Sequence, residues 1–153
     1  MKYEELLKRL MSRESYDKLA ALNNQKVMEF IGFFADHCEP ESIYVCTDSE
    51  ADMQYVRDQA LALGEEKTLS NSKQTIHWDS YKDQARDKNA TKYLVYKENL
   101  EKMKALNSIE YEQGYDEIME ISKGIMKGKQ AVVLFFSEGP TESAFTIPCI
   151  QFT

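Results

Sequence analysis

The first third of the chain has the hydrophobic spacing of helices. Two short apolar stripes, within residues 6–11 and 16–20, precede a stronger one. In that stripe, apolar side chains recur at i, i+3, i+4 and i+7, on one helical face: Val27, Phe30, Ile31 and Phe34. Asn23 or Asn24 can cap this helix, because the side-chain oxygen accepts from a free backbone N–H. Pro40 ends it, since the residue before a proline is pushed out of the helical region.

A strand, a tight turn and a capped helix follow. Residues 42–46 form a compact β-favouring run, which predicts a strand buried on both faces. Residues 50–63 then return to helical spacing and stop at Gly64. Thr47 with Glu50, and Ser49 with Asp52, both have the spacing of a capping box. This order is half of a βαβ unit.

The rest of the sequence predicts four further strands and a helix. Residues 75–78 and 93–96 have short β-favouring runs, and residues 98–113 predict a loop with one helical turn. Helical spacing returns at residues 115–125. The unbroken apolar run at residues 131–136 predicts a central strand. After a turn at residues 137–140, a last strand covers residues 146–152, with Pro148 near its beginning or at an edge.

Helices that alternate with buried strands predict the α/β class, with a layered mixed sheet flanked by helices and a helical N-terminal segment. The sequence has no internal repeat and no shift in composition, so residues 1–153 are expected to form one lobe. The last strand runs up to Thr153. It either ends there as a C-terminal strand or is cut inside an element.

Charge and cysteine content narrow the possible partners. With 19 Lys and Arg against 26 Asp and Glu, the net charge of the 153 residues is −7. Such a chain repels nucleic acid and anionic lipid, so we expect neither as a partner. No apolar run approaches the roughly 20 residues of a membrane-spanning helix. Three widely spaced cysteines without a secretion signal predict reduced thiols and a cytoplasmic protein.

Few residues suggest chemistry by themselves. His37 and His77 lack the neighbouring ligands of a metal site, and no nucleotide-binding or nucleophile motif is present. Two anion-binding candidates remain. The turn at residues 47–49 opens a helix, although ordinary capping explains it better. Arg86 lies in a charged stretch, residues 79–88, and its planar fork of donors suits carboxylate or phosphate.

Three blocks of the sequence resemble GTP-dependent phosphoenolpyruvate carboxykinases, in the order of that family. The first is a Cys-x-Pro, a strand and an Asp-x-Ser-Glu type turn, from Cys38 to Glu50. The second matches the stretch around a substrate-binding arginine: Ser80, Asp83, Ala85, Arg86 and Thr91. The third is Met126-Lys127-Gly128-Lys129, the next strand, Ser137-Glu138-Gly139-Pro140 and Gln151-Phe152-Thr153. Lys129, Glu138 and residues 141–143 depart from the usual residues, which suggests a distant branch.

The resemblance implies an N-terminal, substrate-binding lobe, truncated at its last strand. The family reversibly decarboxylates and phosphorylates oxaloacetate to phosphoenolpyruvate and CO₂. Arg86 would hold these small anionic substrates, while Lys82 and Lys88 are weaker candidates. No catalytic, metal-binding or nucleotide-binding residue is expected within the segment, which would be inactive alone. GTP and a divalent metal, Mn or Mg, would bind in the remainder of the enzyme chain.

Two alternatives stay open. The chain could be a stand-alone, non-catalytic α/β module that binds an anionic metabolite or a protein partner. It could also be a small acidic interaction protein whose similarity is accidental. Sequence beyond Thr153, with a phosphate-binding loop and an acidic metal site, would favour the enzyme over both.

Overall fold

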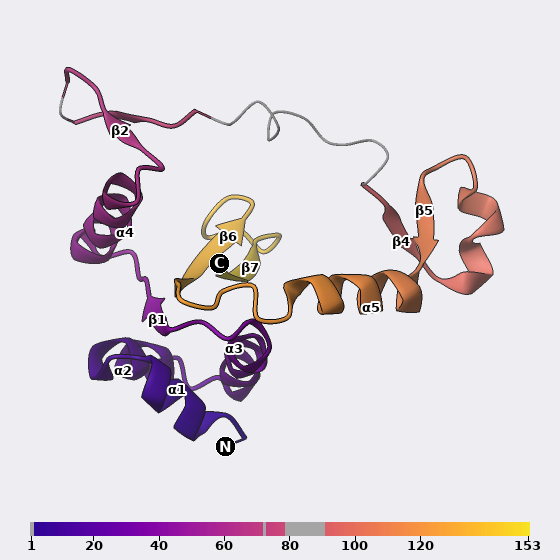
Figure 1. The fold of residues 1–153 in the computed structure, drawn as a ribbon, viewed down its shortest axis with the longest axis horizontal. Helices are drawn as coiled ribbons and strands as arrows, with labels where there is room; N and C mark the ends of the chain where they lie inside the picture. Colours follow the sequence, from indigo (N-terminus) through magenta and orange to yellow (C-terminus); the bar gives the residue numbers. More distant parts are fainter. Residues whose placement is uncertain (1, 72, 79–90) are drawn as a thin grey trace. The chain divides into compact units, whose positions relative to one another are not determined.

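The computed structural model describes residues 2–71, 73–78 and 91–153, and these form a mixed α/β fold (Figure 1). The chain divides into two compact units. The first contains Met1–Gln59 and Lys123–Thr153, and the second contains Ala60–Ser122. The predicted fold class, a mixed sheet flanked by helices with a helical N-terminal segment, is confirmed.

Three helices begin the first unit: α1 (Glu4–Leu10), α2 (Arg13–Ala21) and α3 (Gln25–Cys38). Of the two candidate caps of α3, Asn24 is the one used, and its Oδ1 accepts from the N–H groups of Lys26 and Val27 at 3.1 and 3.3 Å. The helix ends at Cys38, and the next residue, Glu39, takes a left-handed conformation with φ of 54° before Pro40.

The sheet of the first unit has the order β1-β6-β7. Its strands are β1 (Ser42–Val45), β6 (Gln130–Glu138) and β7 (Ile147–Phe152). β1 pairs with β6 in parallel, and β6 pairs with β7 antiparallel, so the predicted central position of β6 is confirmed. Thr153 and Val132 exchange both N–H···O bonds. The alternation of an antiparallel ladder therefore turns the nitrogen of Pro148 away from β6, towards the outer edge.

Helices α1–α3 cover one face of this sheet. The core that they share with it contains Leu7, Leu19 and Ile31 from the helices and Val45 and Val133 from the strands, all at most 1% exposed. Ile150 and Phe152 of β7 pack against this core. Alternate residues of a strand point to the same face of the sheet. The register therefore places three sets of residues on the side of the helices: Ile43 and Val45 of β1, Ala131, Val133 and Phe135 of β6, and Ile150 and Phe152 of β7.

α4 (Glu50–Ala62) leads into the second unit, which holds two small sheets. β2 (Lys67–Thr68) pairs with β3 (Thr75–Ile76), and β4 (Tyr93–Val95) pairs in parallel with β5 (Ser108–Glu110). Two 3₁₀ turns, η1 (Lys97–Asn99) and η2 (Glu101–Met103), connect β4 to β5. α5 (Tyr111–Ser122) ends the unit.

Several predicted details are wrong. β1 is fully buried on one face only, with Tyr44 half-buried on the other, because α1–α3 lie on a single side of the sheet. The turn expected at residues 137–140 begins later, since Ser137 and Glu138 still pair with β7. The loop expected at residues 98–113 contains β5, which pairs with a strand 15 residues earlier. α5 begins at Tyr111, four residues before the predicted start.

Candidate functional site

Arg86, the predicted substrate-binding residue, lies outside the residues that the structure describes, together with Lys82 and Lys88. The described chain resumes at residue 91, just before β4. There Lys92 forms an ion pair with Glu117 of α5, with the Nζ and Oε2 atoms 3.2 Å apart. The role of Arg86 therefore stays a prediction from the sequence.

The turn between β1 and α4, the other anion-binding candidate, uses its donors internally. Ser49 Oγ accepts from the N–H of Asp52 at 3.1 Å, as a helix cap does. The N–H of Ser49 donates to Thr47 Oγ1 at 3.3 Å, and the N–H of Thr47 donates to the Asp52 carboxylate at 2.8 Å. These contacts make the turn a capping structure, which is the explanation that the sequence favoured.

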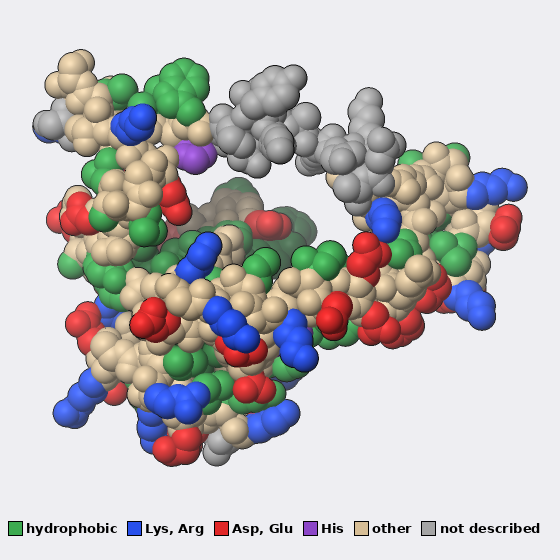
Figure 2. Space-filling view, viewed as in Figure 1, with side chains coloured by type: hydrophobic (Ala, Val, Ile, Leu, Met, Phe, Trp, Pro, Cys, Tyr) green, Lys and Arg blue, Asp and Glu red, His purple; other side chains and the backbone are tan. Residues whose placement is uncertain are grey.

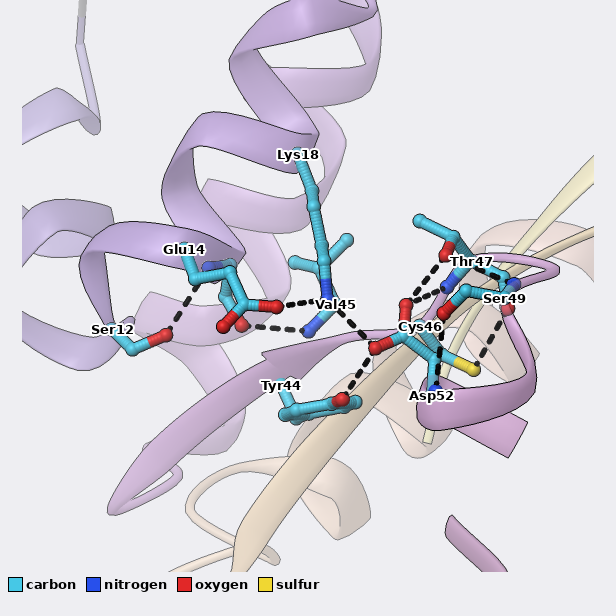
Figure 3. Close-up of polar contacts among 10 residues, drawn as sticks. Ser12, Glu14, Lys18, Tyr44, Val45, Cys46, Thr47, Ser49 and Asp52 are labelled. Atoms are coloured by element: carbon cyan, nitrogen blue, oxygen red, sulfur yellow. Dashed lines mark hydrogen bonds and ion pairs between the residues drawn. The ribbon is translucent and has the colours of Figure 1, made fainter. Parts of the chain in front are cut away.

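Asp52 is the centre of the best-built polar site in the described chain (Figure 3). We call Lys18, Tyr44, Thr47, Ser49 and Asp52 the Asp52 cluster. Asp52 is 2% exposed, although it lies on the first turn of a largely solvated helix. Its Oδ1 accepts from Lys18 Nζ at 2.7 Å and from the Tyr44 hydroxyl at 2.5 Å. Its Oδ2 accepts from Thr47 twice, from the backbone N–H and from the hydroxyl at 2.5 Å.

The cluster joins three elements that are distant in the sequence. Lys18 comes from α2, where it also pairs with Glu14 Oε1 at 2.8 Å, while Tyr44 comes from β1. The Tyr44 ring stacks on Tyr55 of α4, with centroids 3.9 Å apart. The strand is thereby fixed between two helices by a polar network.

Electrostatics keep Asp52 ionised. Burial alone would raise the pKa of its carboxyl, but the hydrogen bonds from Lys18, Thr47 and Tyr44 outweigh burial and hold that pKa well below its usual range. The hydrogen bond to Asp52, followed by the one to Glu14, raises the pKa of Lys18. Burial, and then the bond to Asp52, raises the pKa of Tyr44 to about 12.

The Asp52 cluster suits a structural role better than a catalytic one. A general acid must carry a proton near neutral pH, and the low pKa of Asp52 prevents that. Both carboxylate oxygens are also occupied by protein donors. The cluster positions the β1–α4 turn. Sequence reasoning had assigned Asp52 only to a capping box, and the spacing gave no sign of Lys18, 34 residues away.

The remaining polar candidates have structural surroundings. His37 stacks on Phe33 with ring centroids 6.1 Å apart, and His77 Nδ1 lies 2.6 Å from the carbonyl oxygen of Glu65. Burial raises the pKa of the Cys38 and Cys46 thiols, which makes them poor nucleophiles. Within residues 2–71, 73–78 and 91–153, no group of three His, Cys, Asp or Glu side chains could hold a metal ion. In the same residues, no helix is long and apolar enough to cross a membrane.

The sequence matches a family described as phosphoenolpyruvate carboxykinase N-terminal domain over residues 29–153. The chain belongs to this family. The match begins inside α3 and includes the complete sheet of the first unit and all of the second unit. It also includes the Asp52 cluster, except for Lys18.

Curated relatives extend the similarity to the N-terminal helices. The chain is 48% identical to the phosphoenolpyruvate carboxykinase [GTP] of Pyrococcus horikoshii over 149 residues, 97% of the chain. It is 48% identical to that of Pyrococcus abyssi and 34% identical to that of Saccharolobus solfataricus, again over 97% of the chain. The alignment covers 24% of each relative, so the chain spans about a quarter of their length.

Proposed function

We propose that this chain is the N-terminal part of a GTP-dependent phosphoenolpyruvate carboxykinase and that its role is to bind the anionic substrate. The observation that carries the proposal is the family match over residues 29–153, joined to 48% identity with relatives named for that activity. In this proposal, GTP and a divalent metal bind in the part of the enzyme beyond this segment.

Arg86 is the residue that we assign to the substrate. Oxaloacetate carries two carboxylates, and phosphoenolpyruvate carries a carboxylate and a phosphate. A guanidinium binds such groups through two parallel N–H···O bonds, while an ammonium offers a point charge. A clamp of this kind also holds the substrate as charge moves between carboxylate, enolate and phosphoryl groups.

Substitution of Arg86 in the full-length enzyme tests this role. We expect Arg86→Ala to lower kcat/KM for oxaloacetate and for phosphoenolpyruvate by about 100-fold, because a charge-assisted bidentate contact is lost. The KM for GTP should stay within about twofold, since the nucleotide site is placed elsewhere. Arg86→Lys, which keeps the charge but not the fork, should recover only part of the loss.

Arg13→Ala is the matched control. Arg13 is 95% exposed and its Nε lies 3.7 Å from Asp17 Oδ2 on the surface of α2, so its loss should leave all kinetic constants unchanged. If Arg86→Ala leaves both substrates with unchanged kcat/KM, the assignment of Arg86 is wrong. If the reading frame stops at Thr153, the stand-alone anion-binding module replaces the enzyme proposal.

A further inference from the structure

On one face of the β1-β6-β7 sheet, β6 and β7 carry apolar side chains that are largely uncovered. The register places five apolar side chains of β6 and β7 on the side opposite to α1–α3: Val132, Leu134, Phe136, Ile147 and Cys149. The polar side chains of Gln130, Glu138 and Gln151 lie on the same side. We call the five apolar residues the open face. Val132 and Leu134 are half-buried, whereas Phe136 is 46% exposed and Ile147 is 59% exposed.

The sequence of β6 is that of a strand covered on both sides. Residues 131–136 are apolar without alternation, a pattern typical of strands with packing on both faces. The helix side satisfies this pattern at Ala131 and Val133, which are completely buried, whereas Phe135 at its end is 36% exposed. The open face does not satisfy it, because exposure increases from Val132 towards Phe136. An α/β layered domain normally covers both faces of such a strand.

We propose that the open face is an internal interface of the full-length enzyme, covered by polypeptide that lies beyond residue 153. This inference rests on the proposed function. It is supported by length, since the chain corresponds to 24% of each GTP-dependent relative and about three quarters of their polypeptide lies outside it. It is also supported by chemistry. On this side of β6 the one charged side chain is Glu138, at the end of the strand opposite Ile147, and the side chains from Val132 to Phe136 are apolar, so the occupant presents an apolar segment to them.

Cys149 reports on this interface without any substitution. It pairs with Phe136 across the β6–β7 ladder, so the two side chains are neighbours on the open face. Its side chain is half-buried, whereas Cys38 and Cys46 are buried within the first unit. Labelling with a thiol reagent therefore compares the reaction rate of Cys149, on the open face, with the rates of two buried thiols of the same protein.

The first measurement is the rate of thiol modification in the native full-length enzyme, followed residue by residue by mass spectrometry. An Arg13→Cys variant supplies a fully exposed reference thiol, and the denatured enzyme supplies complete labelling. We expect Cys149 to react about 100-fold more slowly than the reference, at a rate independent of protein concentration, because it reacts only after local opening. Rapid reaction overturns the proposal. Protection that appears only at high concentration also overturns it, since a second copy is then the occupant.

The second measurement identifies the occupant. A photo-crosslinking phenylalanine analogue at position 136 of the full-length enzyme should form crosslinks within one chain to residues beyond 153. Crosslinks to another copy or to residues 60–122 would overturn the proposal. An enzyme that is active but has a reactive Cys149 contradicts only this inference, whereas a purified full-length product without carboxykinase activity contradicts the proposed function.

Discussion

At the residue scale, Asp52 is a buried charge that the fold uses for positioning. Four hydrogen bonds from Lys18, Tyr44 and Thr47 reach its carboxylate, and their donors come from α2, β1 and the turn before α4. A buried carboxylate is costly unless all of its lone pairs are satisfied, and here the satisfied carboxylate connects α4 to α2 and β1. α4 itself has Asp52 as its buried residue, while its Met53 is 52% exposed.

Asp52→Asn tests this role. The amide keeps the shape but loses the charge, and Lys18 is left with Glu14 as its remaining partner. We expect the free energy of unfolding to fall by about 2 to 3 kcal/mol, measured by urea denaturation. Asp48→Asn is the matched control, because Asp48 is exposed in the same turn and its replacement should change stability by less than about 0.5 kcal/mol. Equal effects of the two substitutions would contradict the role of the Asp52 cluster.

The same carboxylate predicts a pH dependence. The pKa of Asp52 is lowered in the folded protein, so the folded state favours the ionised form. Its stabilising contribution is complete above the unfolded pKa of about 3.9 and is lost as the pH falls below that value. Between about pH 5 and pH 2, the stability of Asp52→Asn should therefore fall less steeply than that of the wild type. Parallel curves from thermal denaturation would show that Asp52 does not titrate in this way.

At the element scale, local signals predicted the larger elements well. The stripe around Phe30 and Ile31 identified α3, and the apolar run at residues 131–136 identified the central strand. β5 was missed because three residues at positions 108–110 become a strand only by pairing with Tyr93–Val95. The Asp52 cluster was missed for the same reason, since Lys18 and Asp52 meet only in the tertiary structure.

Gly32 shows a packing constraint between the N-terminal segment and α3. A Cβ atom at this position would overlap the Cβ and Cγ atoms of Tyr3, and side-chain rotation cannot move the Tyr3 Cβ. Gly32→Ala should therefore destabilise the protein by about 1 to 3 kcal/mol, although alanine is the better helix former. Thermal denaturation of Gly32→Ala alone and combined with Tyr3→Gly, which also removes the Tyr3 Cβ, measures the coupling. If Tyr3→Gly does not relieve the effect of Gly32→Ala, the close contact is not its cause.

At the scale of the whole molecule, the first unit has a closed core and an open sheet face. α1–α3 and one side of the sheet bury a continuous set of apolar residues. The other side exposes Phe136 and Ile147, and the outer edge of β7 offers free backbone groups for pairing. On the face shown in Figure 2, basic and acidic side chains are interspersed over α1–α3, and acidic side chains gather along α5. The net charge of −7 is therefore the difference between 26 acidic and 19 basic side chains, and the surface in this view carries both signs.

Residues 1–153 on their own should self-associate. Apolar surface on the open face and an unpaired strand edge favour contact between copies. We expect sedimentation velocity to show a weight-average mass that increases with concentration, and Phe136→Lys to reduce this increase. Trp78→Lys is the control, because Trp78 is 76% exposed in the second unit. A monomer at all concentrations would contradict the exposure of the open face.

The central claim is that the chain begins a GTP-dependent phosphoenolpyruvate carboxykinase, and one assay tests it most directly. The protein made from the complete reading frame is purified and supplied with oxaloacetate, GTP and a divalent metal, and phosphoenolpyruvate is measured. We predict GTP-dependent formation of phosphoenolpyruvate, with Arg86→Ala strongly impaired. Absence of phosphoenolpyruvate from a folded, full-length protein with either Mn or Mg would contradict the claim.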